Sequence, residues 1–504
     1  MSVLLVQTSA IALVAWLLIR YVAKLARKPK LDMAYLDFED GDNSLQRYLN
    51  STCDLLERGY EQYLKKGLPF AMFNYMDVST PIVTLPVKYL GEVRSASASK
   101  LSFTSFLNKS TVAEDIGAPL VTDRVIHMVR QDLNKTLNEL IEPIQQACDQ
   151  VLQAVIPPCP DWTPVNGHML LWPLISRIMT RALLGPELWS NDEWHAVVMS
   201  YFQAGHAASQ RVRDTYRPWL RWTAKYFEKE VKAIYAARRK GEDILQPLID
   251  ARIADAVNRA NNSQQKPGFN DAIQWLVDSY MAEKKPVKAA EIMQDVAFLL
   301  AASLQSTTLN SLSMLLDLVE RPESVAEIRD EISQVYAQYG SWTRQSLGAL
   351  RVLDSFLKES QRLNTFQFNT MQRRALEDYT FKDGLRIPAG TSIVMPSRLL
   401  GRDPDLHTDA AEFDAKRWKR MRDQGDATKF HFASLEDNML PWGSGPHACP
   451  GRFLVQEVIK IIFMRLVTKY DIKFSDGIES RPPDFPQHAG SNPNVMAMVL
   501  FKER

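Results

Sequence analysis

Residues 441–452 constrain the fold of this chain more than any other segment. Three glycines and three prolines among these twelve residues fix a tight, irregular backbone that is neither a regular helix nor a strand. The next eighteen residues, Phe453 to Tyr470, place apolar side chains at helical spacing and predict a strong amphipathic helix. Cys449 is therefore expected at or just before a helix N-terminus, with Pro450 at a favoured first-turn position.

This position gives Cys449 a defined chemistry. The dipole and the free backbone amides at a helix start lower the pKa of a thiol and stabilise its thiolate. A thiolate on a glycine-rich loop can serve as a strongly donating axial ligand of a haem iron. The glycines also let a flat macrocycle approach the backbone closely.

Three other interpretations fit parts of the same loop. Residues 443–448 match the dinucleotide fingerprint G-x-G-x-x-[GA], but residues 435–440 are too polar to form the buried strand that should precede it. A nucleophilic cysteine would need a histidine partner, and His447 is near it in sequence. A structural cysteine in a turn is the default for an isolated cysteine. The flanking pattern favours the haem ligand over all three.

Charge and cysteine content exclude several classes of partner and cofactor. The 504 residues carry 60 Lys and Arg against 59 Asp and Glu, so no global field favours nucleic acid as a partner. An apolar fraction of 46% predicts a globular chain with an ample core. Four cysteines, none in a C-x-x-C pair, are too few for a disulfide framework and lack the usual zinc spacing.

The N-terminus is the most strongly biased segment. Residues 3–23 are almost entirely apolar and are followed by the cationic residues Lys24, Arg27, Lys28 and Lys30. We expect residues 1–30 to form a single-pass membrane anchor with a basic flank, which holds the rest of the chain in the cytosol. A cleaved signal peptide fits less well because no cationic region precedes the apolar stretch. An ordinary core helix is the alternative.

The remaining residues, 31–504, predict one large domain that is mainly α with a minor β-sheet region. Helical periodicity dominates residues 42–362, including residues 120–141, 290–320 and 323–338, the last stopped by Gly340. Residues 258–269 are polar and predict a surface loop. Short strands are expected within residues 379–396 and 495–501, so that the C-terminal third contributes most of the sheet.

The loop around Cys449 resembles the haem-binding signature of the cytochrome P-450 family, F-x-x-G-x-[RH]-x-C-x-G. The matching positions hold Trp442, Gly445, His447, Cys449 and Gly451. The resemblance implies that Cys449 is the axial ligand of haem b and that His447 hydrogen-bonds a haem propionate. Trp442 replaces the usual Phe and is expected to pack beside the sulfur, where its indole N–H can tune the thiolate.

Two further motifs stand in the order expected for the same family. Glu359 and Arg362 lie on one helix face and resemble its E-x-x-R pair, which alone would be an ordinary solvated salt bridge. Residues 413–418 resemble the later F-x-x-x-R-[FW] segment and contribute Arg417. The resemblance implies that Glu359, Arg362 and Arg417 form a buried structural triad and are not catalytic.

The predicted helix at residues 290–320 carries a weaker match to the oxygen-activation motif of the family. Thr307 aligns with the motif threonine, whereas Ser306 stands in place of its acid and Leu304 in place of its small residue. The resemblance implies that Thr307 delivers a proton through its hydroxyl and water. The alternative is a core threonine whose hydroxyl bonds a preceding carbonyl.

The residues for the haem propionates and for a redox partner are less specific. The helix-borne W-x-x-x-R contact has no clear match, and its candidates are Arg124, His127 and Arg130. Arg373 or Arg374 is a candidate for the other propionate. A basic docking patch, or alternatively a solvated face, is formed by Lys419, Arg420, Arg422 and Lys460.

The resemblance implies a haem-dependent monooxygenase that uses dioxygen and NADPH-derived electrons from a separate membrane reductase. The loop spelling GPHACPGR resembles that of filamentous-fungal enzymes that tailor terpenoid, polyketide or indole-derived secondary metabolites. We therefore expect a lipophilic substrate and an endoplasmic-reticulum membrane location. The alternatives are a haem-thiolate isomerase or peroxygenase that needs no reductase, a non-catalytic haem-binding sensor, and a haem-free interaction protein.

Overall fold

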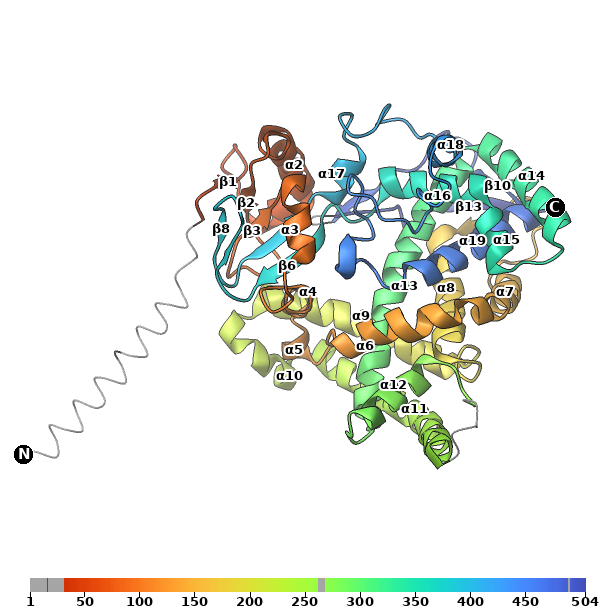
Figure 1. The fold of residues 1–504 in the computed structure, drawn as a ribbon, viewed down its shortest axis with the longest axis horizontal. Coiled ribbons are helices and arrows are strands. Elements are labelled where there is room, and N and C mark those ends of the chain that lie inside the picture. The colour runs from red at the N-terminus through yellow and green to blue at the C-terminus, as the bar shows by residue number, and fades with distance from the viewer. Residues whose placement is uncertain (1–15, 17–30, 262–267, 488–489) are drawn as a thin grey trace, which may run out of the picture.

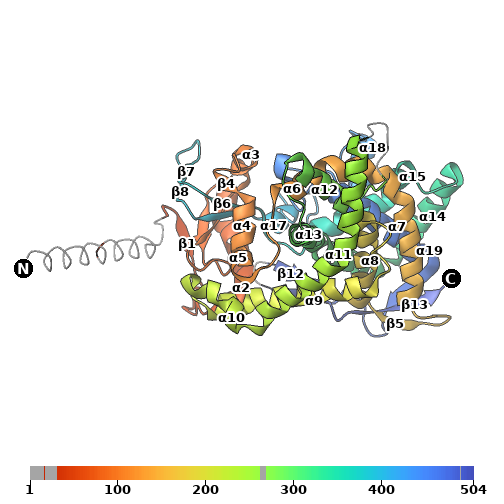
Figure 2. The same cartoon turned by 90° about the horizontal axis from the view of Figure 1, so that it is seen from below.

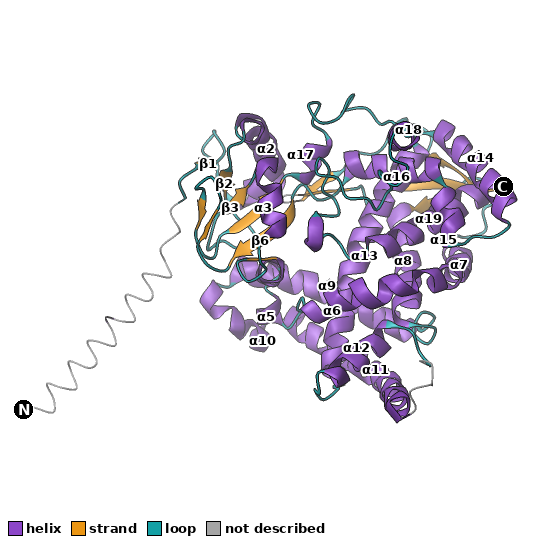
Figure 3. Ribbon diagram, viewed as in Figure 1, coloured by secondary structure: helices purple, strands orange, loops and turns teal. Residues whose placement is uncertain are grey.

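Helices dominate the computed structural model of this chain, which describes residues 16, 31–261, 268–487 and 490–504 (Figure 3). The longer helices are α2 (Leu45–Gln62), α7 (Asn134–Val155), α8 (Gly167–Leu184), α9 (Asp192–Thr215), α11 (Lys229–Asn261), α12 (Ala272–Ala282), α13 (Ala289–Val319), α14 (Pro322–Tyr339), α16 (Arg351–Asn364) and α19 (Arg452–Lys469). The shorter ones are α3 (Leu90–Ser95), α4 (Phe103–Ser110), α5 (Ala113–Ile116), α6 (Asp123–Met128), α10 (Ala224–Phe227), α15 (Arg344–Ala349), α17 (Ser397–Gly401) and α18 (Arg417–Gln424). Short 3₁₀ helices are η1 (Leu64–Lys66), η2 (Val87–Tyr89), η4 (Pro218–Thr223) and η5 (Gly445–His447), and η3 (Val129–Leu133) is a short π-helix.

The strands form one larger sheet and three small ones. The six-stranded sheet has the order β1-β2-β3-β9-β6-β4, and the strands β10, β13 and β5 form a three-stranded sheet. Two hairpin-like pairs, β11-β12 and β7-β8, complete the β structure of the described residues. The strand bounds are β1 (Ala34–Leu36), β2 (Phe70–Met72), β3 (Ile82–Thr84), β4 (Leu101–Ser102), β5 (Thr163–Asn166), β6 (Thr370–Ala375), β7 (Tyr379–Thr380), β8 (Arg386–Ile387), β9 (Ser392–Met395), β10 (Tyr470–Phe474), β11 (Phe485–Gln487), β12 (Gly490–Asn492) and β13 (Met498–Glu503).

The mainly helical fold with a minor β region is confirmed, and eight of the thirteen strands in the described residues, β6 to β13, lie in the C-terminal third as expected. The larger sheet, however, takes most of its strands from the N-terminal part of the chain, where no strands were predicted. Strands β1 to β4, all before residue 103, supply four of the six strands of the larger sheet. Three of them have only three residues and one has two, too few to show the alternation on which strand prediction depends. Figure 1 shows this sheet at one end of the molecule, beside α2 and apart from the main body of helices.

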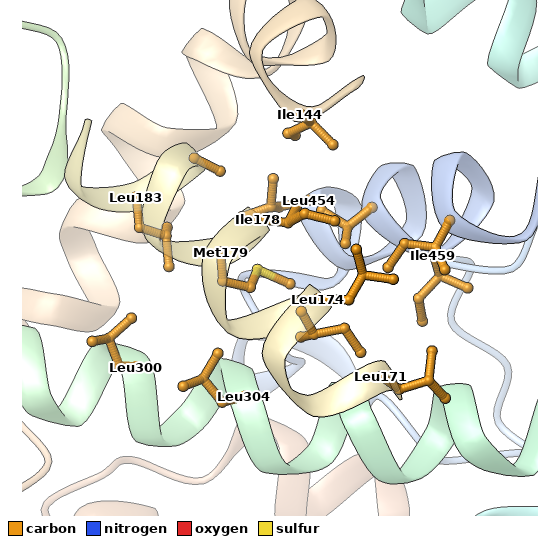
Figure 4. Packing of buried hydrophobic residues seen from close by; sticks show 14 of the residues in the cluster. Ile144, Leu171, Leu174, Ile178, Met179, Leu183, Leu300, Leu304, Leu454 and Ile459 are labelled. Atoms are coloured by element: carbon orange, nitrogen blue, oxygen red, sulfur yellow. The ribbon is translucent and has the colours of Figure 1, made fainter. Parts of the chain in front are cut away.

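Helix α13 runs through the middle of the helical body (Figure 1). Its residues Leu300 and Leu304 face α8, whose apolar side chains also lie against α19 (Figure 4). All of these residues are buried in one hydrophobic cluster. Because burial of a leucine or isoleucine side chain contributes about 1.5–3 kcal/mol, this packing fixes α13 relative to the helix that follows Cys449.

The predicted helices over residues 290–320, 323–338 and 453–470 are confirmed as α13, α14 and α19, and α14 ends at Gly340. Three local predictions differ from the structure in detail. Helix α19 begins at Arg452 with Gly451 as its N-cap, so Pro450 precedes the helix. The stretch 120–141 is divided into α6 and α7 by the π-helical turn η3. Helix α11 continues to Asn261 into the predicted loop, and residues 262–267 lie outside the described residues.

The predicted membrane anchor, residues 1–30, lies outside the described residues except for Trp16. In the part of the chain that the structure describes, no helix combines the length and the apolar character needed to cross a bilayer.

Candidate active site

The loop that carries Cys449 closes on itself through its backbone. The amide of Cys449 donates a hydrogen bond to the carbonyl of Trp442 at 2.8 Å. Between these two residues the chain turns at Gly443 and Gly445, whose φ angles of +74° and +63° favour glycine. A Cβ at Gly445 would also lie 3.1 Å from the Arg94 side chain. The glycines therefore permit the turn that presents the thiol.

The thiol of Cys449 does not have the lowered pKa that its position at a helix start predicts. Burial raises the pKa of Cys449, while backbone hydrogen bonds from Gly451 and Arg452 and the charge of Arg452 oppose that rise. The helix amides do act on the sulfur, but desolvation outweighs them in the chain alone. A bound cation at the sulfur, such as a haem iron, would reverse this balance.

The indole N–H of Trp442 does not point at the sulfur, contrary to the expectation that it tunes the thiolate. Its N–H donates to the carbonyl of Phe432 at 2.9 Å, and the two rings pack edge to face with their centroids 5.5 Å apart. The indole N–H is therefore engaged and does not tune the sulfur. Trp442 instead ties the Cys449 loop to the preceding segment, whose Ala433 carbonyl accepts from Arg452 at 3.2 Å.

Arg373 is a buried cation without a carboxylate partner among the described residues. Its side chain is 2% exposed, and one Nη donates to the Gln372 carbonyl at 2.7 Å. The Nε and the second Nη have no hydrogen-bond partner in the described part of the chain. Burial lowers the pKa of Arg373 to about 10. Because a desolvated guanidinium is costly unless it is paired, this site fits an anionic group.

The charge of Arg373 also acts on His447, which belongs to the Cys449 loop. Burial lowers the pKa of His447, and the charges of Arg373 and Arg130 lower it further. The Cys449 loop thus contributes an imidazole that the charge of a buried guanidinium helps to keep neutral. Both groups are suitable donors for carboxylates such as the propionates of haem.

The structure distinguishes among the arginines that the sequence left as equal candidates for binding the haem propionates. Arg374, next to Arg373, is already paired with Asp77 at 2.6 Å. Arg124 is paired with Glu283 at 2.8 Å. Arg130 donates to the carbonyl of Pro446 and so contacts the Cys449 loop directly, and His127 lies in the last turn of α6.

The middle of α13 has solvent-exposed side chains. Ala302 and Gln305 are exposed, although most of this long helix is buried. Thr307 is 1% exposed, and its hydroxyl has no hydrogen-bond partner among the described residues. The Ser306 hydroxyl, in contrast, donates to the carbonyl of Ala302 at 3.1 Å. The back-bonded arrangement considered for Thr307 is therefore found at Ser306.

Glu359, Arg362 and Arg417 meet in the interior. The two carboxylate oxygens of Glu359 accept from Arg362 at 2.7 and 3.0 Å and from Arg417 at 3.1 Å. Arg362 also donates to the carbonyls of Gly401 and Ala410 at 2.6 and 2.7 Å. These contacts join α16 to α18 and to the irregular chain between them, which gives the cluster a structural role.

A second buried ionic cluster, centred on Asp354, was missed by sequence reasoning and corrects the proposed docking patch. Two of the four residues assigned to the docking patch, Arg422 and Lys460, are buried. They bind the carboxylate of Asp354 from α18 and α19, respectively. Despite desolvation, the charges of Lys460 and Arg422 hold the pKa of Asp354 below its usual range. The other two patch residues, Lys419 and Arg420, pair with Asp423 and Asp414.

Comparison with known proteins agrees with this site. The sequence profile of the cytochrome P450 family matches residues 187–501. The chain is 40% identical over 473 residues to the cytochrome P450 monooxygenase cheE of Chaetomium globosum, covering 93% of this chain and 91% of that protein. It is 35% identical over 446 residues to the pyrichalasin C-7 hydroxylase of Pyricularia grisea, covering 88% and 86% of the two chains.

A solved structure shows the same fold at low sequence identity. The retinoic acid-bound cyanobacterial CYP120A1 superposes with a TM-score of 0.68 at 17% identity, covering 94% of this chain and 100% of that one. The resemblance noted in the sequence is thus confirmed by a profile match over more than half of the chain and by relatives aligned over most of it. The chain belongs to the cytochrome P450 family and is a haem-dependent monooxygenase.

Proposed function

We propose that this enzyme hydroxylates or otherwise oxidises a lipophilic fungal secondary metabolite, such as a terpenoid or polyketide. The dioxygen-derived atom enters the substrate, and the electrons come from NADPH through a separate reductase. The observation that carries the proposal is the unpaired buried cation Arg373, whose charge acts on His447 in the Cys449 loop. Fungal relatives that include a named hydroxylase support the reaction class.

Each residue of the site has one task in this proposal. Haem b, when bound, supplies the redox and oxygen chemistry. Cys449 binds the iron through its sulfur, and Gly445 keeps the turn open. Arg373 and His447 bind the carboxylates of the cofactor. Thr307 holds a proton at its hydroxyl oxygen, which is free to donate.

The dependence of the reaction on a reductase is tested by leaving the reductase out of the assay. We expect product formation from NADPH and dioxygen only when a fungal cytochrome P450 reductase is added to the haem-loaded enzyme. A haem-thiolate isomerase would form product without NADPH, and a peroxygenase would form it from hydrogen peroxide alone. Untargeted metabolite comparison of strains with and without the gene would supply the substrate for this assay.

Removing the hydroxyl of Thr307 is expected to uncouple the reaction. In Thr307→Ala, product formed per NADPH consumed should fall roughly tenfold or more, because proton delivery from a positioned group is lost. Ser306→Ala is the matched control, since that hydroxyl already donates to the carbonyl of Ala302. Equal coupling in the two variants would remove Thr307 from the proton path. The ratio of product formed to NADPH consumed is measured for each variant by parallel assays of NADPH oxidation and of product.

We also propose that residues 1–30 anchor a catalytic domain of residues 31–504 to the endoplasmic-reticulum membrane, with that domain in the cytosol. A second feature supports membrane contact. Between α9 and α11 the chain exposes large aromatic side chains, with Trp219, Trp222 and Phe227 at 67%, 58% and 74%. Exposed cations flank them at Arg217, Lys225 and Lys229. Tryptophan at an interface and cations near anionic lipid both favour membrane contact.

The position of this aromatic segment agrees with the anchor proposal. Figure 2 shows α10, which carries Phe227, at the same end of the molecule as β1, the first strand after residue 30. The three-stranded sheet that contains β5 lies at the opposite end (Figure 2). An anchor and an aromatic segment at one end would fix the orientation of the enzyme on the bilayer.

Fluorescence quenching tests this contact in the full-length enzyme. After reconstitution into vesicles that contain brominated lipid, replacing Trp219 and Trp222 together by Phe is expected to remove a quenched component of the tryptophan emission. Trp162→Phe is the control, because this side chain is 40% exposed beside β5 at the far end. Unaltered quenching in the double variant would show that the aromatic segment does not touch the bilayer.

A further inference from the structure

The strand that carries Arg373 contains an unfavourable backbone conformation at Met371. Its φ angle is +53°, in the left-handed region that L residues other than Gly, Asn and Asp rarely adopt. The register between β6 and β9 shifts between Thr370 and Arg373, so Met371 lies within a β-bulge. Such strain persists only where surrounding contacts hold it, and it is concentrated at functional sites.

The side chain of Met371 makes a specific contact with the Cys449 loop. The backbone amide of Ser444 donates to the Sδ of Met371 at 3.2 Å. Both residues are buried, Met371 at 4% and Ser444 at 2% exposure. The same sulfur lies 3.6 Å from the position that a Cβ on Gly443 would take. A thioether is a weak acceptor, yet a buried amide without any acceptor costs more than a weak bond contributes.

Ser444 lies between the two glycines whose positive φ angles form the turn. Backbone hydrogen bonds close the turn at its ends, from Cys449 to Trp442 at 2.8 Å and from Gly443 to Leu440 at 2.9 Å. Between the two conformationally free glycines, the amide of Ser444 has the Met371 sulfur as its acceptor. The Ser444 hydroxyl adds only a long contact of 3.5 Å from Arg94. The sulfur of Met371 therefore holds the centre of the turn from the side of β6.

We propose that Met371 is a positioning residue for the thiolate ligand, acting through the amide of Ser444. The bulge that aims the sulfur at Ser444 also sets the direction of Arg373, two residues later. One strained segment thereby fixes the Cys449 turn and the proposed propionate cation relative to each other. The inference rests on the proposed role of Cys449, and it concerns how that ligand is held.

Three variants distinguish the effect of the Met371 sulfur as an acceptor from the effect of the backbone strain at this residue. Met371→Leu keeps a similar size and the backbone strain but removes the acceptor. Met371→Gly relieves the positive φ and also removes the acceptor. Met395→Leu is the matched control, because Met395 is a fully buried methionine on β9, opposite Thr370 in the same pair of strands.

Hydrogen–deuterium exchange at Ser444 gives the first readout, in the haem-loaded full chain. We expect exchange there to be roughly fivefold faster in both Met371 variants than in Met395→Leu, the factor that corresponds to a bond of about 1 kcal/mol. Conversion of the reduced carbon monoxide complex to a form without thiolate ligation should accelerate by a similar factor. The global unfolding equilibrium, followed by circular dichroism, should differ between Met371→Leu and Met395→Leu by much less than this fivefold factor.

The outcomes have distinct meanings. If both Met371 variants match Met395→Leu in Ser444 exchange and in loss of thiolate ligation, the inference is wrong. If Met371→Gly behaves like wild type while Met371→Leu does not, strain and not the sulfur controls the turn, which also overturns it. If wild type itself shows no thiolate-ligated haem, the proposed function fails, whereas exchange at Ser444 still decides whether Met371 holds the turn.

Discussion

Replacing Glu359 by glutamine is expected to lower the free energy of unfolding by about 3–5 kcal/mol, the usual cost of removing one partner from a buried ion pair. Glu359 and Arg362 have no exposed side-chain surface, and Arg417 is 11% exposed. The substitution leaves two cations facing a neutral amide in the interior. Such a penalty is a large part of the stability of most domains.

The control for this variant is Glu412→Gln. Glu412 takes part in the same cluster only through its backbone carbonyl, which accepts from Arg362 at 3.0 Å, and its side chain is exposed. Surface substitutions of this kind change stability by about 0.5 kcal/mol or less. Denaturant unfolding of both variants, followed by circular dichroism, measures the difference. Equal midpoints would mean that the Glu359 cluster does not support the fold.

Replacing Arg373 by leucine is expected to change two properties in opposite directions. The haem-free chain should be unchanged or more stable, because an unpaired buried guanidinium is replaced by an apolar side chain. Haem affinity should fall by about tenfold or more, within the range for loss of a group that supports a metal site. Thermal unfolding of the haem-free chain and transfer of haem to apomyoglobin measure the two effects separately.

Arg374→Leu should give the opposite pattern. Arg374 is paired with the buried Asp77, so its loss leaves that carboxylate unpaired and should destabilise the haem-free chain. Its effect on haem transfer should be small. If Arg373→Leu destabilised the haem-free chain and left haem transfer unaltered, the assignment of Arg373 to an anionic group of the cofactor would fail.

The neighbours Arg373 and Arg374 show where sequence reasoning reached its limit. Both follow the E-x-x-R motif at nearly the same spacing, and neither charge nor periodicity distinguishes them. The bulge at Met371 decides which of the two points into the interior without a partner. A bulge depends on the register of β6 against β9, which is a contact between distant segments that local sequence does not encode.

The same reason explains the error at Arg422 and Lys460. A basic residue in a charged helix is usually solvated, and its pattern predicts a surface. Their burial depends on Asp354, which lies on another helix and accepts from both cations. Conversely, the helices α13, α14 and α19 were predicted well because their boundaries are set by local signals. The apolar spacing and Gly340 mark these boundaries within a few residues.

The Cys449 loop was accessible to sequence reasoning because its chemistry is local. Its glycines, prolines and the helix start lie within a dozen consecutive residues. The surrounding donors were only partly accessible, since His447 was named, whereas Arg373 remained one of two candidates. The pKa of Cys449 was predicted in the wrong direction because desolvation depends on every element packed around the loop.

The most direct test of the central claim is the absorption spectrum of the reduced enzyme with carbon monoxide. We predict a Soret band near roughly 450 nm, because this position requires thiolate ligation of the haem iron. In Cys449→Ala this band should be absent even where haem is retained, whereas Cys148→Ala, which alters a buried cysteine elsewhere in the chain, should keep it. A wild-type band at the shorter wavelength of histidine-ligated haem, or a 450 nm band that survives in Cys449→Ala, would contradict the account.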